Sequence, residues 1–180
     1  MMKDNKGIRP TVEERPSTEQ LSELYGKYGQ PAVHHRTWNL SQLNEDFSPP
    51  ACSGEVVMVI HDNRSMIAYV ARCDHPTDWF FPMGRINIGE SIDRAAIREA
   101  FEETGLMVEI SSIPLLYVVK ICFNDWDLIR WNFIVIGRMV GGDIRPVDIH
   151  EIENASFFNK IPGNSDPFLM EWAEDIMGRI

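Results

Sequence analysis

One stretch of 23 residues, GRINIGESIDRAAIREAFEETGL at positions 84–106, constrains the fold of this chain more than any other. Its informative members are Gly84, Glu90, Arg98, Glu99, Glu102, Glu103 and Gly105. Seven specified residues at roughly 6% background each, over about 160 starting positions, would coincide on the order of once in a million chains of ordinary composition. The stretch therefore predicts a glycine turn, a polar loop and a carboxylate-lined helix in direct succession.

The helix of this stretch has recognisable ends. Ser91 is a typical N-cap residue and Gly105 a typical stop, so we expect the helix to span residues 92–104. At about 100° of rotation per residue, one face of this helix combines apolar and small side chains. The members of that face, which we expect to be buried, are Ile97, Ala100, Phe101 and Thr104.

The opposite face of the predicted helix carries three glutamates. Glu99, Glu102 and Glu103 fall within an arc of about 100°, and Arg98 lies one turn before Glu102. Like charges this close repel by roughly 1 kcal/mol per pair in water, so we expect a neutralising positive charge beside them. Oxygen ligands suit hard divalent cations, and an incomplete cage favours magnesium or manganese over structural calcium or zinc. The alternative is a solvated helix with Glu–Arg pairs.

The spacing G-x5-E-x7-R-E-x2-E-E-x-G, followed by the aliphatic Leu106, resembles the Nudix box. The flanking strand pattern extends the resemblance to about residues 54–160. The resemblance implies an α/β Nudix fold, in which a mixed β-sheet is packed between helices as an α-β-α sandwich.

The resemblance to the Nudix family also implies a metal site and a set of catalytic residues. The ligands it assigns to Mg2+ or Mn2+ are Glu99, Glu102, Glu103 and the backbone carbonyl of Gly84. The catalytic residues it implies are Arg98, Glu99, Glu102 and Glu103. Arg98 and Glu90 are expected to hold the carboxylates in place.

A general base must take a proton from the attacking water. In the Nudix family this base is either a box glutamate or a carboxylate on a distant loop. We therefore expect Glu99 to be the base, with Glu151 or Glu153 as the loop alternative.

The implied function is divalent-metal-dependent hydrolysis of a diphosphate linkage. The expected substrate is a nucleoside diphosphate linked to another moiety, a dinucleoside polyphosphate or a related phosphorylated metabolite. One alternative is a catalytically silent Nudix-like module that senses a ligand or a partner. Another is an isopentenyl diphosphate isomerase-like enzyme, which needs a cysteine with a glutamate, although Cys52, Cys73 and Cys122 all lie outside the box.

Charge and hydropathy exclude several classes of partner. The formal net charge of −10 argues against general nucleic-acid binding and is compatible with a small phosphorylated substrate that arrives with its metal. Apolar runs such as Val56–Ile60 are far too short to span a membrane. The polar N-terminal residues do not resemble a signal peptide, so we expect a cytoplasmic protein.

The chain divides into an N-terminal extension, residues 1–50, and a hydrolase domain, residues 51–180. In the extension we expect a loosely ordered tail over residues 1–16, a helix that Ser17 and Gln20 cap, and a strand around HHRTWNLS. This extension is too short to fold alone, so it should dock on the core or mediate a homodimer. A C-terminal helix at residues 167–177 is expected on the side of the sheet opposite the helix at 92–104.

Overall fold

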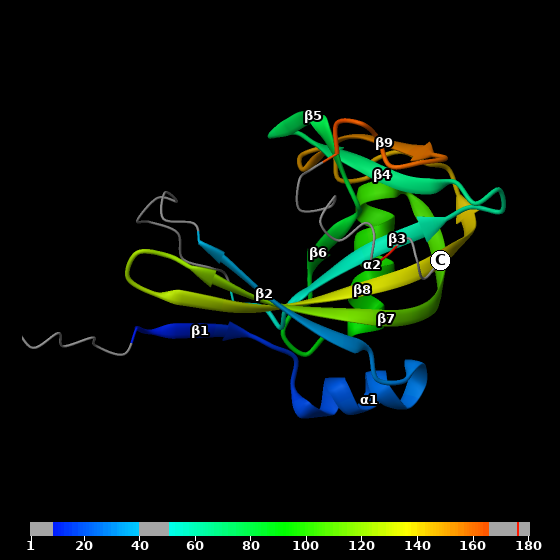
Figure 1. Ribbon diagram of the computed structural model, residues 1–180. Coiled ribbons are helices and arrows are strands. Elements are labelled where there is room, and N and C mark those ends of the chain that lie inside the picture. The colour runs from blue at the N-terminus through cyan, green and yellow to red at the C-terminus, as the bar shows by residue number, and fades with distance from the viewer. Residues whose placement is uncertain (1–8, 40–50, 166–175, 177–180) are drawn as a thin grey trace, which may run out of the picture.

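The computed structural model describes residues 9–39, 51–165 and 176, and Figure 1 shows their arrangement. The helices and strands, in chain order, are β1 (Thr11–Glu14), α1 (Thr18–Tyr28), β2 (Ala32–Asn39), β3 (Glu55–His61), β4 (Ile67–Arg72), β5 (His75–Phe80), β6 (Met83–Arg85), α2 (Ile92–Thr104), β7 (Leu106–Cys122), β8 (Asp127–Gly142) and β9 (Ile152–Phe158). The predicted helix at 92–104 is confirmed at both ends, and Gly105 closes it in the left-handed conformation.

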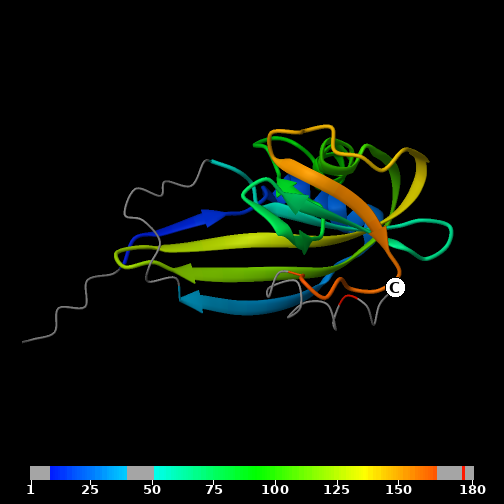
Figure 2. The same ribbon diagram turned by 90° about the horizontal axis from the view of Figure 1, so that it is seen from above.

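The described strands form one mixed sheet in the order β2-β7-β8-β3-β4-β5, with β1 paired to β8, β6 to β3 and β9 to β4. β7 and β8 form a long antiparallel hairpin, and β1 and β2 run beside it (Figure 2). Both β1 and β3 pair in parallel with β8, β1 along residues 127–130 and β3 along residues 132–138. The two strands therefore follow one another along the same edge of β8.

Two clusters of buried side chains cover the two faces of the sheet. β3 contributes to both, because Val56 and Met58 belong to one cluster and Val57 and Val59 to the other. α1 and α2 pack against the first face. Ile176, which is helical and buried, belongs to the cluster on the second face. The rest of the predicted C-terminal helix lies outside the described residues.

The buried face of α2 differs from the prediction. Ala100 and Thr104 are buried as expected, but Ile97 is 45% exposed and Phe101 is 47% exposed. The face that meets the sheet is instead made of small side chains together with one glutamate. Its buried members are Ile92, Ala95, Ala96, Ala100, Glu103 and Thr104. Alanines let the helix lie close to the strands. The large apolar residues Ile97 and Phe101 therefore did not mark the buried face of α2.

The N-terminal extension is ordered over residues 9–39. The capping box between Ser17 and Gln20 is present at the start of α1, and the predicted strand is β2, which pairs in parallel with β7. The prediction of a loosely ordered tail is wrong for residues 11–14, which form β1. Residues 1–8 and 40–50 lie outside the described part. The division at residue 50 and the homodimer stay predictions.

No helix among the described residues combines the length and the apolarity that crossing a membrane requires.

Candidate active site

The predicted site lies where β6 leads through a short loop into α2. β6 pairs antiparallel with β3, which places Gly84 opposite Val56 in the middle of the sheet. At the start of the loop, Ile86 exchanges backbone hydrogen bonds with its neighbours, donating to the carbonyl of Gly54 at 2.9 Å and accepting from the N–H of Ser53 at 2.8 Å. The loop is therefore tied to the segment that precedes β3.

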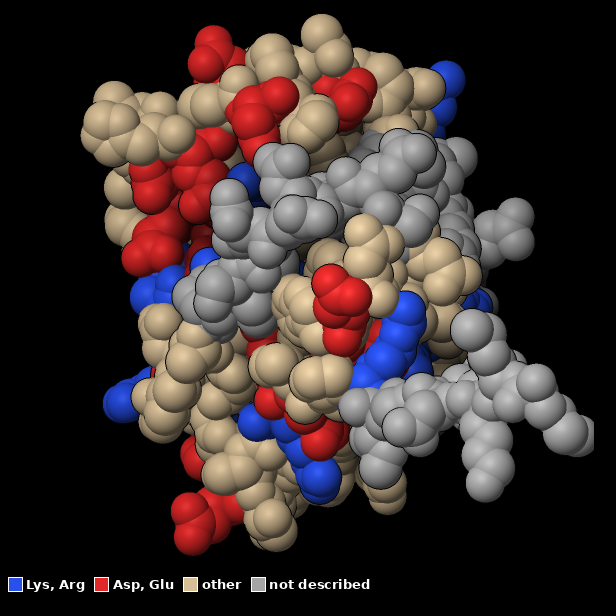
Figure 3. Space-filling model, turned by 90° about the vertical axis from the view of Figure 1, so that its left-hand side faces the viewer, with Lys and Arg blue, Asp and Glu red and all other residues tan. Residues whose placement is uncertain are grey.

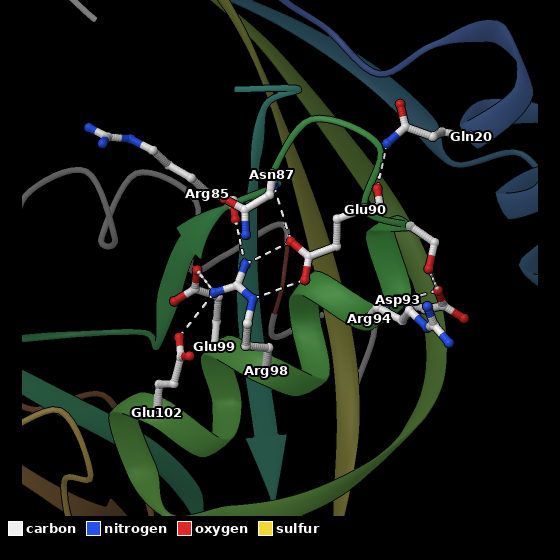
Figure 4. Close-up of polar contacts among 10 residues, drawn as sticks. Gln20, Arg85, Asn87, Glu90, Asp93, Arg94, Arg98, Glu99 and Glu102 are labelled. Carbon is white, nitrogen blue, oxygen red and sulfur yellow. Dashed lines mark hydrogen bonds and ion pairs between the residues drawn. The ribbon is translucent and has the colours of Figure 1, made fainter. Parts of the chain in front are cut away.

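Arg98 is the centre of the polar network in this site (Figure 4). Its Nε and Nη2 donate to the two carboxylate oxygens of Glu90 at 2.9 and 2.8 Å. Its Nη1 donates to Glu99 at 2.6 Å and to Glu102 at 3.0 Å. Nη2 also donates to the backbone carbonyl of Arg85 at 2.9 Å, so the guanidinium uses every N–H donor that it has. Arg98 thus supplies positive charge to three of the carboxylates around it.

Besides its bidentate contact with Arg98, Glu90 closes a turn in the loop between β6 and α2. Its backbone N–H donates to the carbonyl of Asn87 at 2.9 Å, and its carboxylate accepts from the N–H of Asn87 at 3.1 Å. The hydrogen bonds from Arg98, which outweigh the effect of partial burial, lower the pKa of Glu90 below its ordinary value. Glu90 is therefore held as a carboxylate.

Gly84 makes room for the carboxylate of Glu99. A Cβ atom added at position 84 would lie 2.0 Å from Cδ of Glu99 and 2.2 and 2.3 Å from its two oxygens. Gly84 does not adopt a left-handed φ, so the glycine is needed here for space rather than for its backbone conformation. The close approach of β6 and α2 depends on this missing side chain.

Burial changes the pKa values of two glutamates on α2. Loss of solvation raises the pKa of Glu99 to about 7, against the opposing effect of Arg98. Glu103 is 3% exposed and accepts a hydrogen bond from the backbone N–H of Met83 at 2.8 Å. Burial, with the nearby charges of Glu99 and Glu151, raises the pKa of Glu103 well above its ordinary value. Burial therefore opposes the charged form of both side chains, and a bound divalent cation would favour it.

An open cleft of about 270 Å³ lies beside these residues. The side chains and backbone that line it belong to Glu55, Arg72, Met83, Gly84, Arg85, Glu99 and Glu151. Of the two loop glutamates predicted as alternative bases, Glu151 is therefore part of the cleft. Glu153 is exposed on β9 and is not among the lining residues.

Arg72 is a member of the site that the sequence did not reveal. It ends β4, and its Nη1 donates to Glu151 at 2.9 Å while its Nε donates to Asp74 at 3.1 Å. Among the described residues, nothing accepts a hydrogen bond from its Nη2. Arg72 reaches the cleft because β4 pairs with β9, which places it opposite Ile152. This long-range pairing leaves no local signal in the sequence.

The predicted carboxylate cluster is only partly assembled. Glu99 and Glu102 meet at Nη1 of Arg98, whereas Glu103 is turned toward the N–H of Met83. Within residues 9–39 and 51–165, no three Asp, Glu, His or Cys side chains are grouped so that they could hold a metal ion. The donor set itself, carboxylate oxygens and a glycine carbonyl, is of the kind that Mg2+ and Mn2+ prefer. The half-buried Glu99 and the buried Glu103, both with raised pKa values, also fit a nearby cation, since a cation would favour their charged forms.

Comparison with known proteins gives one family. The family model described as NUDIX domain matches residues 54–160. A MutT-like protein of Streptomyces ambofaciens is 32% identical over 78 residues, which are 43% of this chain and 50% of that protein. An RNA pyrophosphohydrolase of Haemophilus influenzae (strain PittEE) is 38% identical over 65 residues, 36% of this chain and 32% of that protein. A putative 8-oxo-dGTP diphosphatase of Bacillus subtilis (strain 168) is 39% identical over 59 residues, 33% of this chain and 38% of that protein. The chain thus spans half or less of the length of these curated relatives.

Solved structures show the same fold. A NUDIX hydrolase from Nitrosomonas europaea superposes with a TM-score of 0.54 at 24% identity, over 69% of this chain and 87% of that chain. A UDP-X diphosphatase superposes with a TM-score of 0.51 at 16% identity, over 90% of this chain and 71% of that chain. The share of this chain in the second superposition is larger than residues 51–180 alone could supply, so part of the N-terminal extension is included.

Proposed function

Because this chain belongs to the NUDIX domain family, we propose that it hydrolyses a diphosphate linkage in a small phosphorylated molecule at the cleft beside α2. The observation that carries the proposal is the network of Arg98, which fixes Glu99 and Glu102 beside a glycine that leaves room for a carboxylate. The two relatives named as a pyrophosphohydrolase and a diphosphatase support the same type of linkage.

The proposed metal ligands are Glu99, Glu102, Glu103 and the backbone carbonyl of Gly84, with Mg2+ or Mn2+ as the cation. When bound, the cation would offset charge on the phosphate oxygens and lower the pKa of a nearby water. Arg98 and Glu90 position two of these carboxylates, because the bidentate contact fixes the guanidinium plane from which Nη1 reaches them.

We assign the general base to Glu99. Its side chain lines the cleft, where a general base must come within hydrogen-bond reach of the attacking water. Glu151 also lines the cleft, where its carboxylate contacts Arg72, and it is the second candidate. The exposed position of Glu153 on β9 makes it the weakest of the three.

Arg72 is the proposed contact for a substrate phosphate. Its guanidinium is oriented by Asp74 and Glu151, and Arg72 lines the cleft with no described acceptor for its Nη2. On the face shown in Figure 3, Lys and Arg side chains lie among Asp and Glu side chains, and no broad basic surface is seen among the described residues drawn there. An acidic protein with a few positioned Lys and Arg side chains suits a small phosphorylated metabolite better than a long nucleic acid.

The function is tested with a panel of phosphoanhydrides, each incubated with Mg2+, with Mn2+ and with EDTA, and the products are separated by ion-exchange chromatography. The panel holds nucleoside diphosphate sugars, dinucleoside polyphosphates, oxidised nucleoside triphosphates, diphosphoinositol phosphates and a short RNA with a 5′-triphosphate. We expect cleavage of at least one compound that EDTA abolishes. No cleavage of any compound would instead favour a ligand-sensing module.

The isomerase alternative finds no support in the cleft, because none of the cysteines is among the described residues that line it. Isopentenyl diphosphate is included in the panel as a direct check, with isomerisation followed by NMR.

A further inference from the structure

The loop between β6 and α2 is held at both ends but open at its tip. Ile86 is tied to Ser53 and Gly54, as described above. At the tip, the side chain of Ile88 is 73% exposed, and a Cβ atom added at Gly89 would touch nothing within 4 Å. The far end of the loop is Glu90, whose backbone carbonyl accepts a hydrogen bond from Nε2 of Gln20 in α1 (Figure 4).

Gln20 uses the oxygen and the nitrogen of its side-chain amide for two different purposes. Its Oε1 accepts from the backbone N–H of Ser17 at 2.7 Å, and its backbone N–H donates to Oγ of Ser17 at 3.2 Å, which together make the capping box of α1. Its Nε2 reaches 70 residues along the chain to Glu90. The residue that caps the extension's helix thus also holds the end of the candidate active-site loop.

α1 is firmly enough docked to serve as an anchor for that hydrogen bond. Leu21 and Leu24 are 6% and 3% exposed, and they pack in the same cluster as the buried residues of α2. One turn after Leu24, Nζ of Lys27 lies 2.5 Å from the carboxylate of Asp93 in the first turn of α2. Two residues of α1, Gln20 and Lys27, therefore hold the start of α2 in place.

We propose that Gln20 is a positioning residue for the hydrolytic site, acting through the backbone of Glu90 on Arg98 and, through Arg98, on Glu99 and Glu102. The inference rests on the proposed function and gives the N-terminal extension a role in it. Glu90 is the bidentate partner that orients the guanidinium, so a shift of its backbone moves the donor that holds both carboxylates. Misplacement of a reacting group by about 1 Å costs on the order of 100-fold in rate, so a loop end released by a few tenths of an ångström has a measurable effect.

The substitution Gln20→Glu separates the two purposes of the side chain. A glutamate at this position keeps an oxygen that accepts from the N–H of Ser17, because Glu serves as well as Gln in a capping box. It cannot donate to the carbonyl of Glu90 when it is ionised, which is ensured by assay at about pH 8.5. The matched control is Gln30→Glu, the same chemical change at an exposed position after the end of α1.

A second variant, Ser17→Ala, makes the opposite change. It removes the hydroxyl that caps α1 but leaves Nε2 of Gln20 free to donate to Glu90. Loss of such a cap lowers the stability of the helix. Ser17→Ala should therefore lower the melting temperature with little effect on turnover.

We measure kcat and KM on the substrate that the panel identifies, the Kd for Mn2+ by electron paramagnetic resonance, and thermal unfolding by circular dichroism. For Gln20→Glu we expect kcat to fall and the Kd for Mn2+ to rise, each about 10-fold, with KM unchanged and with a melting temperature lowered no more than in Ser17→Ala. Gln30→Glu should match the wild type. Wild-type kcat and Mn2+ affinity in Gln20→Glu, or losses that simply follow the melting temperature in both Gln20→Glu and Ser17→Ala, would overturn the inference.

The proposed function can fail separately. If the wild type cleaves no compound, the hydrolase proposal is wrong, and the Mn2+ affinities of wild type and Gln20→Glu still decide whether Gln20 positions the carboxylates. If the wild type binds no Mn2+ either, the role of Gln20 is refuted with it.

Discussion

The space that Gly84 leaves for Glu99 gives the sharpest prediction, the substitution Gly84→Ala. The new methyl carbon would lie 2.0 Å from Cδ of Glu99, whereas carbon atoms in contact are separated by about 3.5 Å or more. The carboxylate must therefore move by roughly 1.5 Å. Because its hydrogen bond from Arg98 is 2.6 Å long, a shift of this size takes it out of hydrogen-bonding range.

Gly84→Ala should reduce activity strongly and stability moderately, and the protein should still fold. The group that must move is the end of a flexible side chain, so the strain is about 1 kcal/mol, with about 1 kcal/mol more for the lost hydrogen bond. For a protein of this size, that lowers the melting temperature by roughly 4 to 8 °C. We expect kcat to fall about 100-fold, because the displaced carboxylate is proposed both to bind the cation and to accept the proton.

The assay compares kcat on the identified substrate and the Kd for Mn2+ in Gly84→Ala and in Gly26→Ala. Gly26 lies in α1, has a helical φ, and a Cβ atom added there would touch nothing within 4 Å, so this control should keep full activity and gain slight stability. Wild-type turnover and Mn2+ affinity in Gly84→Ala would show that the position of Glu99 does not matter for the reaction.

Three further predictions concern the same helix. Glu103→Gln keeps the size of the side chain and an acceptor for Met83 but removes the charge, so kcat should fall by about two orders of magnitude with the fold intact, whereas Arg94→Gln on the exposed side should be mild. Wild-type turnover in Glu103→Gln would exclude it as a ligand. Arg98→Lys replaces a forked guanidinium with a single ammonium group, so we expect kcat about 100-fold lower, with Arg94→Lys as control; equal activity of the two would contradict the network. Without added cation, the raised pKa of Glu99 gives stability that is complete below its ordinary value of 4.5 and is lost as the pH rises through about 7. Since cation binding requires the ionised carboxylate, Mg2+ should raise the melting temperature more at about pH 8 than at about pH 6, and the reverse order, measured by differential scanning fluorimetry, would contradict the assignment.

Local signals in the sequence predicted the ends of the elements well. Ser17 with Gln20 marked the start of α1, and Gly105 marked the end of α2, because capping depends on residues that are adjacent in the chain. The buried face of α2 was harder to predict. Ile97 and Phe101 are exposed, and the helix is buried through alanines and Glu103, whose hydrogen bond to Met83 depends on the position of β6.

Features that depend on distant pairings could not be predicted. β1 is a short polar strand, and one carboxylate oxygen of its buried Glu14 accepts a hydrogen bond from Nε of Arg130 in β8. Arg130 also binds Glu55 of β3 at 2.7 Å, so it joins the two strands that follow one another along β8. Arg72 reaches the cleft through the pairing of β4 with β9 in the same way. The residues close in sequence to these side chains do not indicate which distant partners they contact.

The parallel pairing of β1 with β8 has a consequence for folding during synthesis of the protein. Thr11 lies opposite Asp127 in the sheet, so the first strand leaves the ribosome long before its partner has been made. At about 5 to 20 residues per second, the wait lasts roughly 5 to 25 seconds. β2 waits in the same way for β7, with Ala32 opposite Leu115. Throughout that interval the nascent extension lacks its pairing partners, which are residues 115–122 of β7 and 127–130 of β8.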